Sequence, residues 1–318
     1  MYRERSIALV IPAYREEKLI AKTLAAVPPL FDRVFVVDDK SPDNQAQVVL
    51  DYAKKDPRVT LLRHETNQGP GGGIITGYQA SAAAGIDLTV VIGGDHQMDL
   101  AQVHGFLDPL IDGKADYAKG NRFLLKELAE TMRLMPRLRL FGNWLITALT
   151  KISSGYFKVM DVVDGYTAIT RKAIEGVDWS RAWRGYGYPM DFLIRLNAYG
   201  FKVIDVPRTA IYTPGERQSQ IKGIRYALRV SPMLLRGFFW RLRFKYLYRD
   251  FHPLVLFYFG ALGLVPAGLL GGLYLIYDKI WRGGLGVSGP RTVLVALALT
   301  SGFQFLLFAF LFDMEEGK

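Results

Sequence analysis

Short, continuous apolar runs recur through the first hundred residues and alternate with longer stretches of helical periodicity. Runs of this length without polar alternation are typical of strands buried on both faces of a parallel sheet. The predicted strands are 7–11, 33–38, 59–63 and 89–92. Apolar residues at helical spacing predict the helices between them, over 16–27, 45–54, 74–84 and 100–110. This alternation predicts a doubly wound α/β sheet.

The pattern is less regular in the second hundred residues. A further strand is expected at 202–207, where it closes the sheet. An apolar helix is expected over 143–152, lying near a bilayer surface, and another helix opens at 185–191.

From about residue 220 onward the composition changes. Basic and apolar residues alternate over 222–249, which is typical of an amphipathic segment in a membrane interface, with nucleic-acid binding as the rival use of such charge. Residues 253–277 then provide 25 positions without a charge, and 292–312 another 21. Each of these stretches is long enough to cross a bilayer.

These patterns divide the chain into an α/β domain (1–220), basic amphipathic juxtamembrane helices (221–250) and a two-helix transmembrane anchor (251–318). The N-terminal residues lead directly into a strand and lack the apolar core of a signal peptide. Because the basic segment precedes the first span, the positive-inside rule places it in the cytoplasm, and two crossings return the C-terminus there. We expect an integral, two-pass protein with both termini cytoplasmic, although the outer loop at 278–291 carries three basic residues.

Composition narrows the classes of function. The 318 residues carry a net charge of +10, and half of them are hydrophobic. A basic chain could meet nucleic acid, an anionic membrane or a phosphorylated substrate. The charge here crowds beside the apolar C-terminal segments, which favours a membrane and argues against nucleic acid. The chain has no cysteine, which excludes a disulfide framework and thiolate chemistry.

The candidate chemistry centres on the segment that follows the strand at 89–92. Two glycines there allow a sharp turn that would bring Asp95, Gln97 and Asp99 close to a bound anion at the carboxyl edge of the sheet. Carboxylate and amide oxygens suit Mg²⁺ or Mn²⁺, which could bridge to a diphosphate. The alternative is an acidic surface turn with Met98 tucked into the core, since the pattern is short.

Two further polar segments follow predicted strands. Asp38 and Asp39 are placed to accept hydrogen bonds from a ribose or a base, and a helix N-cap at Ser41 or Asp43 is a compatible interpretation. The glycine-rich loop at 67–73 is expected to leave backbone N–H groups for a phosphate or a sugar, but it matches neither the Walker nor the dinucleotide fingerprint. A dinucleotide-binding enzyme is therefore disfavoured.

Four of these segments carry a resemblance to a known family. They are Val10-Ile-Pro-Ala-Tyr-Arg-Glu-Glu17, Val36-Val-Asp-Asp-Lys-Ser41, Asn67-x-Gly69 with Gly77, and Gly94-Asp-His-Gln-Met-Asp99. In this order they resemble the motifs of the family 2 inverting glycosyltransferases, and most of all the polyprenyl-phosphate and dolichyl-phosphate sugar synthases. The resemblance covers roughly 6–222 and implies a GT-A (Rossmann-like) mixed, mainly parallel sheet.

The resemblance also implies roles for individual residues. The nucleotide-sugar, a UDP- or GDP-hexose by family frequency, would be held by Pro12, Tyr14, Glu16, Asp38, Asp39, Gly69 and Asp95. A divalent metal, Mg²⁺ or Mn²⁺, would be bound by Asp95 and Gln97. The family commonly has Asp-x-Asp-x-Gln here, whereas this chain has Gly93 at the first position. Asp99, His96 or a water could take the place of that carboxylate.

Basic residues are the candidates for the acceptor. Residues 116–122 resemble the family strand that ends in Gly-x-Arg, and 161–166 resemble the family strand with the pattern Asp-x-x-x-Gly-Phe/Tyr. Residues 212–219 resemble the loop that closes over the donor and the lipid phosphate. The predicted lipid-phosphate ligands are Arg122, Arg217, Ser219 and Lys222, with Arg137, Arg139 and Arg208 as alternatives. Asp95, Arg122 and Arg217 are the predicted catalytic residues.

The predicted activity is inverting transfer of a sugar, expected to be a hexose, to polyprenyl or dolichyl phosphate at the cytoplasmic membrane face, by a protein that could form homo-oligomers. A phosphate monoester is already largely a dianion at neutral pH, so no carboxylate is assigned as an essential base. The alternatives are a membrane glycosyltransferase acting on another lipid or a polysaccharide, and a non-catalytic scaffold derived from one. A processive polysaccharide synthase would usually need more spans and a Gln-x-x-Arg-Trp motif, which Arg181-Ala-Trp-Arg184 does not supply.

Overall fold

The computed structural model describes residues 1–122, 137–209, 223–283 and 288–317. These residues form two compact units, Met1–Phe238 and Phe239–Lys318. The predicted ligands Arg217, Ser219 and Lys222 lie outside the described residues.

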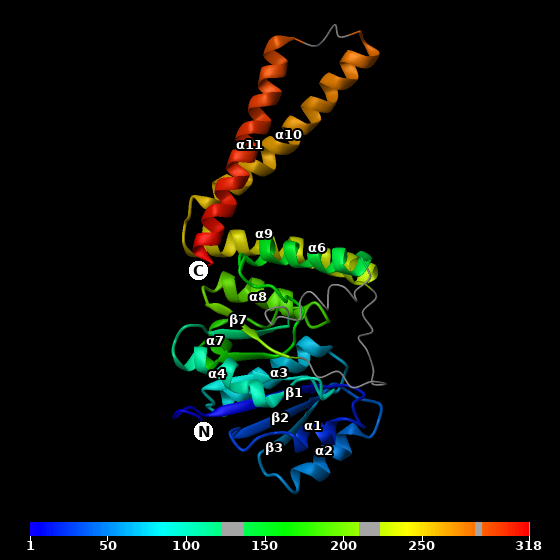
Figure 1. Cartoon of the computed structure of the whole chain (residues 1–318), viewed down its shortest axis with the longest axis vertical. Helices are drawn as coiled ribbons and strands as arrows, with labels where there is room; N and C mark the ends of the chain where they lie inside the picture. The colour runs from blue at the N-terminus through cyan, green and yellow to red at the C-terminus, as the bar shows by residue number, and fades with distance from the viewer. Residues whose placement is uncertain (123–136, 210–222, 284–287, 318) are drawn as a thin grey trace. The chain divides into compact units, whose positions relative to one another are not determined.

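The first unit is built on one mixed, mainly parallel sheet in the order β3-β2-β1-β4-β6-β5-β7 (Figure 1). Its strands are β1 (Ile7–Ala13), β2 (Arg33–Asp38), β3 (Val59–Arg63), β4 (Leu88–Val91), β5 (Tyr117–Asn121), β6 (Thr167–Thr170) and β7 (Val203–Pro207). Only β6 runs antiparallel to its neighbours within the described sheet, and it joins β4 to β5. The parallel strands therefore end at one common edge.

Helices cover both faces of this sheet, and the residues of the central strands β1 and β4 are apolar except for Thr89. The helices of this unit are α1 (Ile20–Ala25), α2 (Gln45–Ala53), α3 (Pro70–Ala83), the 3₁₀ turn η1 (Leu100–Gln102), α4 (Val103–Ile111), α6 (Arg137–Ser154), α7 (Arg171–Gly176) and α8 (Tyr188–Ala198). One core joins α1, α2 and α4 to the face that carries Leu9 and Val36. On the other face α3 packs so closely that a Cβ at Gly77 would lie 2.2 Å from Val10.

Most of the predicted strands and helices are confirmed, with two instructive differences. Helix α3 begins at Pro70, four residues before its predicted start, because proline suits a first helical turn and Gly69 ends the loop at φ +83°. The segment 161–166, interpreted as a strand, is a turn that precedes β6. The backbone turns there because Asp164 Oδ1 accepts a hydrogen bond at 2.9 Å from Tyr166 N, two residues further along the chain.

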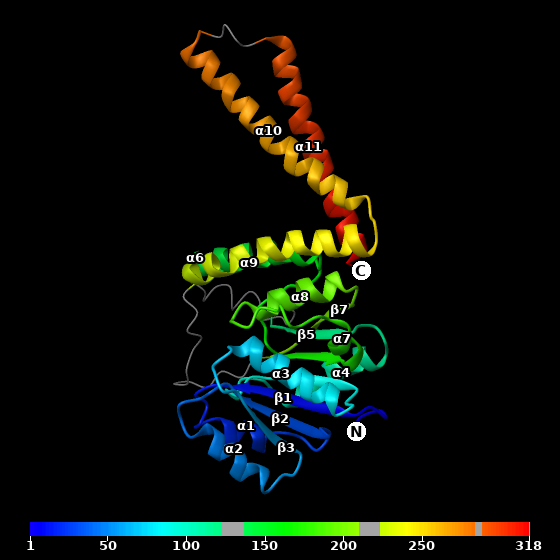
Figure 2. The same cartoon turned by 180° about the vertical axis from the view of Figure 1, so that it is seen from behind.

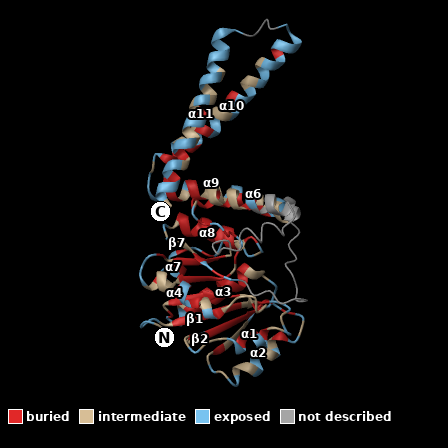
Figure 3. Ribbon diagram, viewed as in Figure 1, coloured by how far each residue is buried: buried red, intermediate tan, exposed pale blue. Residues whose placement is uncertain are grey.

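The C-terminal part contains long apolar helices, as predicted. Helix α9 (Gly223–Arg243) is followed by the π-helical segment η2 (Phe244–Arg249), α10 (Leu254–Trp281) and α11 (Gly289–Glu316). Both α10 and α11 are long and apolar enough to cross a membrane. They pack along each other (Figure 2), and a Cβ at Gly268 would lie 2.7 Å from Leu299. Their outward side chains are largely exposed, whereas the strands of the first unit are buried (Figure 3).

Candidate active site at the carboxyl edge of the sheet

The segment after β4 forms a tight turn that presents Asp95. Within it Gln97 N donates to Asp95 Oδ1 at 3.2 Å, and the residue in the left-handed region is His96, at φ 57°. The two glycines were expected to make the turn, but neither has a positive φ. Gly94 is needed for a close approach instead, since a Cβ there would lie 3.2 Å from Ala13 Cβ and 3.4 Å from Glu16 Cγ. The turns after β1 and β4 are therefore in contact.

Asp99 does not reach toward Asp95. Its two carboxylate oxygens accept hydrogen bonds from Ala101 N at 2.9 Å and from Gln102 Nε2 at 3.3 Å, so it caps η1. Met98 holds the same turn from the other side, because its sulfur accepts Gly93 N at 3.3 Å. Both carboxylate oxygens of Asp99 are therefore engaged within its own turn.

Asp38 lies at the end of β2 and is connected to the β1 turn through one glutamine. Gln45 Nε2 donates to Asp38 Oδ1 at 2.7 Å, and Gln45 Oε1 accepts Glu16 N at 2.9 Å. Arg63 Nε lies 3.2 Å from the other Asp38 oxygen. Burial of Asp38 raises its pKa, although Ser41 N and Arg63 oppose the shift. Neither Ser41 nor Asp43 caps α2, whose N-cap is Asn44.

Asp39 fixes the glycine-rich loop to the sheet. Its carboxylate accepts Gln68 N and Gly69 N at 2.7 Å each, and His64 Nδ1 lies 2.7 Å away. These loop N–H groups were expected to be left for a phosphate or a sugar, but they bind the carboxylate of Asp39. A Cβ at Gly69 would lie 2.6 Å from Arg184 O, so the loop is also packed against the segment before α8.

Pro12 and Tyr14 flank this edge as the chain leaves β1. A Cβ at Gly73 would lie 3.0 Å from Pro12 Cβ, so the proline packs against the start of α3. Tyr14 is exposed, with Arg15 Cζ 5.3 Å from its ring centroid. An exposed aromatic ring at a strand end is available for stacking on a planar group.

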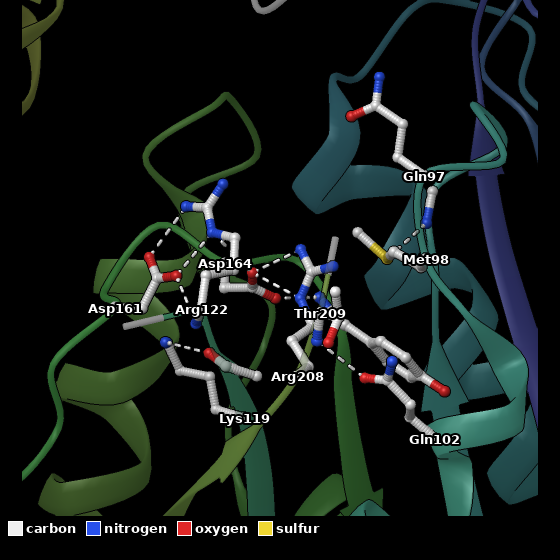
Figure 4. A network of polar contacts seen from close by, with 12 residues as sticks. Gln97, Met98, Gln102, Lys119, Arg122, Asp161, Asp164, Arg208 and Thr209 are labelled. Carbon is white, nitrogen blue, oxygen red and sulfur yellow. Dashed lines mark hydrogen bonds and ion pairs between the residues drawn. The ribbon is translucent and has the colours of Figure 1, made fainter. Parts of the chain in front are cut away.

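A second cluster surrounds Arg122, directly after β5 (Figure 4). Arg122 Nε and Nη2 donate to the two carboxylate oxygens of buried Asp161 at 2.7 and 3.0 Å. The same Nε lies 3.3 Å from Asp164, which also binds Arg208. Burial alone would raise the pKa of Asp161, but the hydrogen bonds and charge of Arg122 lower it overall. Asp161 is therefore a carboxylate that orients Arg122.

Beneath this cluster lies a buried lysine. Lys119 is 1% exposed and donates to Gly120 O at 3.1 Å, and burial lowers its pKa against the charges of nearby aspartates. Asp205, whose pKa burial raises, accepts Asn121 Nδ2 at 2.6 Å and Met160 N at 2.8 Å. This layer ties β5 and β7 together under the edge that carries Arg122.

The two clusters face each other. A Cβ at Gly165 would lie 3.4 Å from Met98 Cε, so the 161–166 turn rests against the turn that carries Asp95. Sequence reasoning had assigned no role to Gln45, Asp161 or Asp164. Gln45 could not be recognised from the sequence, because a polar residue is common at the start of a helix. Asp161 and Asp164 could have been recognised as a pair of acidic residues close to a predicted strand.

The turn after β4 offers a divalent metal only a sparse set of protein ligands, one carboxylate and one side-chain amide. The described residues contain no cluster of three or more His, Asp or Glu side chains placed to hold a metal. Mg²⁺ sites that also bind substrate phosphates often use only one or two carboxylates, and Asp95 with the amide of Gln97 meets that minimum. A Cβ at Gly93 would lie 3.0 Å from Asp95 Oδ1, so the carboxylate that the family commonly supplies would stand beside Asp95.

The chain matches the family described as glycosyl transferase family 2 over residues 8–177, more than half of its length. It therefore belongs to this family and is a glycosyltransferase. This confirms the assignment drawn from the four ordered motifs.

Named relatives are similar over most of their own lengths. The chain is 26% identical over 223 residues to the UDP-N-acetylglucosamine–dolichyl-phosphate N-acetylglucosaminyltransferase of Methanococcus voltae, covering 66% of this chain and 87% of that protein. It is 28% identical over 210 residues to the undecaprenyl-phosphate mannosyltransferase of Micrococcus luteus, covering 64% and 83%. The names of these two relatives give different sugars, and both names include a lipid phosphate.

Among solved structures, glucosyl-3-phosphoglycerate synthase from Mycobacterium tuberculosis in complex with UDP has a TM-score of 0.54 and 18% identity. The match covers 74% of this chain and 80% of that one. Another structure of that synthase contains Mn²⁺ with UDP-glucose. At this identity the likeness shows the fold, and it confirms the expected GT-A architecture.

Proposed function

We propose that this glycosyltransferase moves a sugar, expected to be a hexose, from a UDP- or GDP-linked donor to a polyprenyl or dolichyl phosphate, with inversion. One observation carries the proposal. Relatives named for transfer to dolichyl and undecaprenyl phosphate match 66% and 64% of the chain. Helices α10 and α11 are apolar enough to hold the protein at the surface where such an acceptor resides.

The donor would bind along the β1, β2 and β4 ends. Asp38 and Asp39 stand at the end of β2, Glu16 contacts the β4 turn, and Tyr14 offers an exposed ring for the base. Pro12 and Gly69 would shape the same surface through their packing on α3 and the segment before α8. The diphosphate would then lie near Asp95.

Asp95 and Gln97 are the residues that would hold Mg²⁺ or Mn²⁺. When bound, such an ion offsets the charge that develops on a departing nucleoside diphosphate. The other contributions to the reaction come from the side chains of the protein. Because a phosphate monoester is already largely dianionic near pH 7, the site has to position the acceptor and needs no strong base.

Arg122 would position the acceptor phosphate. Its side chain is 32% exposed, while its partner Asp161 is fully buried. The carboxylate therefore orients the guanidinium from below and leaves part of it accessible to an anion. Arg217, Ser219 and Lys222 are proposed as further ligands from the sequence resemblance alone, as they lie outside the described residues.

We further propose that the glycosyltransferase unit and both termini are cytoplasmic. Basic residues precede α10, which is the distribution that the positive-inside rule associates with the cytoplasm. Arg241, before α10, forms an ion pair with Asp313 near the end of α11. A two-helix hairpin that spans the bilayer would therefore begin and end on one side.

A donor screen tests the activity. The detergent-purified chain is incubated with Mn²⁺, undecaprenyl phosphate and one nucleotide-sugar at a time, and release of nucleoside diphosphate is followed. We expect one donor to give release that depends on the lipid phosphate. Release that is the same without the lipid would contradict the proposed acceptor.

A further inference from the structure

In Arg208, the residue after β7, only part of the guanidinium is hydrogen-bonded to the described residues. Its Nε and Nη2 donate to Asp164 Oδ2 at 2.8 and 2.6 Å. Its Nη1 is buried and has no hydrogen-bond partner among the described residues, and the residue as a whole is 5% exposed. A buried donor of a charged group that lacks an acceptor is costly, so its retention calls for an explanation.

The surroundings of Arg208 are built to accommodate it. A Cβ at Gly120 would lie 2.6 Å from Asp164 Oδ1 and 3.0 Å from Arg208 Cδ, so only glycine leaves room for this pair beside β5. Asp164 is itself fixed, since its Oδ1 accepts Tyr166 N at 2.9 Å. The guanidinium is therefore held in one orientation by a rigid, buried carboxylate.

The pair lies between the two halves of the candidate site. Figure 4 shows the Arg208 guanidinium between the Arg122–Asp161 pair on one side and Gln97 and Met98 of the β4 turn on the other. Asp164 reaches Arg122 as well, at 3.3 Å from its Nε. One carboxylate thus positions two guanidinium groups at the place where a metal-bound diphosphate and an acceptor phosphate would meet.

We propose that Arg208 Nη1 donates a hydrogen bond to a phosphate oxygen of the bound substrates, and that Asp164 is the positioning residue for this donor. The inference rests on the proposed function, which supplies two phosphate sources, the nucleoside diphosphate and the lipid phosphate. A guanidinium suits either, because its planar N–H groups match phosphate oxygens.

The variant Arg208→Lys tests the assignment, because an ammonium preserves the charge beside Asp164 and removes Nη1. The matched control is Arg58→Lys. Arg58 is also paired with an aspartate, Asp56, but its Nη1 is already bound to Pro28 O and Phe31 O at 3.1 and 3.2 Å. Thermal unfolding of the full-length protein in detergent verifies that both variants fold.

Binding is measured in two arms, UDP and GDP with Mn²⁺ in one and undecaprenyl phosphate in the other. We expect Arg208→Lys to weaken one arm about tenfold to a hundredfold, the range for a hydrogen bond to a charged group, while Arg58→Lys changes neither. The arm that weakens identifies which phosphate Nη1 binds. Unchanged binding in both arms, or equal weakening in both, would overturn the proposal.

A second variant covers the case in which Arg208→Lys does not fold. Arg208→Gln keeps a hydrogen-bonding side chain beside Asp164 and leaves unchanged the carboxylate that also contacts Arg122, and the same one-arm loss is expected. Failure of both variants to fold would assign the pair to stability alone and would also overturn the proposal. The wild-type transfer assay separates the two claims, since absence of sugar transfer refutes the proposed function while the nucleotide arm still tests Arg208.

Discussion

Arg241 and Asp313 form a fully buried, bidentate ion pair, with Nη1 and Nη2 each 2.7 Å from a separate carboxylate oxygen. The hydroxyl groups of Tyr246 and Tyr258 donate to the same carboxylate at 2.8 and 3.0 Å. The pair connects the segment before α10 to the last turn of α11. The two apolar helices are therefore tied together at one end by a satisfied polar network.

Breaking this pair should destabilise the C-terminal unit. Asp313→Leu leaves the guanidinium of Arg241 buried without its partner, and removal of one member of a buried pair costs about 3–5 kcal/mol. The double variant with Arg241→Met should recover part of that loss, because no charge is then left buried, although the hydroxyl groups of Tyr246 and Tyr258 still lack their acceptor. Denaturant titration in detergent gives both values, and a single variant as stable as wild type would refute this account of the network.

The topology can be tested with single cysteines, because the chain has none of its own. Glu315→Cys places a thiol at the end of α11, and Ser288→Cys places one at its start, both at exposed positions. A membrane-impermeant maleimide applied to intact cells should label Cys at 288 and should label Cys at 315 only after permeabilisation. Labelling of both without permeabilisation would rule out the two-pass arrangement.

Much of the fold could be predicted from the sequence because its strands are short, uniformly apolar runs that have few other uses. The resemblance implied a mixed sheet, which is confirmed, but the position of the antiparallel strand β6 between β4 and β5 was not predicted, since strand direction depends on long-range connections that no local pattern encodes. The 161–166 segment was wrongly predicted as a strand because it resembles a strand pattern of the family, while the hydrogen bond that Asp164 accepts from Tyr166 N favours a turn.

Some residues of the candidate site could likewise be predicted from the sequence, and others could not. Asp95 and Asp38 could be predicted from their position at strand ends. The role of Asp39 was only partly predicted, because its carboxylate binds loop N–H groups that are 29 and 30 positions away in the chain. The pairing of Asp164 with Arg208, 44 residues apart, has no sequence signal in a single chain.

The turn after β4 leads to a prediction about metal binding. Asp95→Asn should keep the fold, because the amide can still accept Gln97 N, and should reduce turnover about 10²–10³-fold, the usual cost of one lost electrostatic contact at a transition state. Gly93→Asp should tighten Mn²⁺ binding about tenfold, since a second carboxylate adds ligand charge. Release of nucleoside diphosphate measures the turnover of Asp95→Asn, and isothermal titration with Mn²⁺ measures the affinity of both variants. Equal affinity in wild type, Asp95→Asn and Gly93→Asp would place the metal elsewhere.

Arg122 should affect the acceptor more than the donor. Arg122→Gln retains a donor for Asp161 and removes the charge, so the requirement for lipid phosphate should rise about tenfold to a hundredfold at saturating nucleotide-sugar. Lys172→Gln is the control, because Lys172 is an exposed cation that lies beside Asp116 at the opposite end of β5. If Arg122→Gln raises only the donor requirement, this arginine belongs to the diphosphate site.

The central claim is that a lipid phosphate is the nucleophile, and the product itself tests it most directly. Undecaprenyl [³²P]phosphate is incubated with the purified chain and the donor selected by the screen, and the lipid product is isolated for mass and NMR analysis. The account predicts one sugar attached to one phosphate that retains the label, with the anomeric configuration opposite to that of the donor. A diphosphate-linked product, or retained configuration, would contradict it.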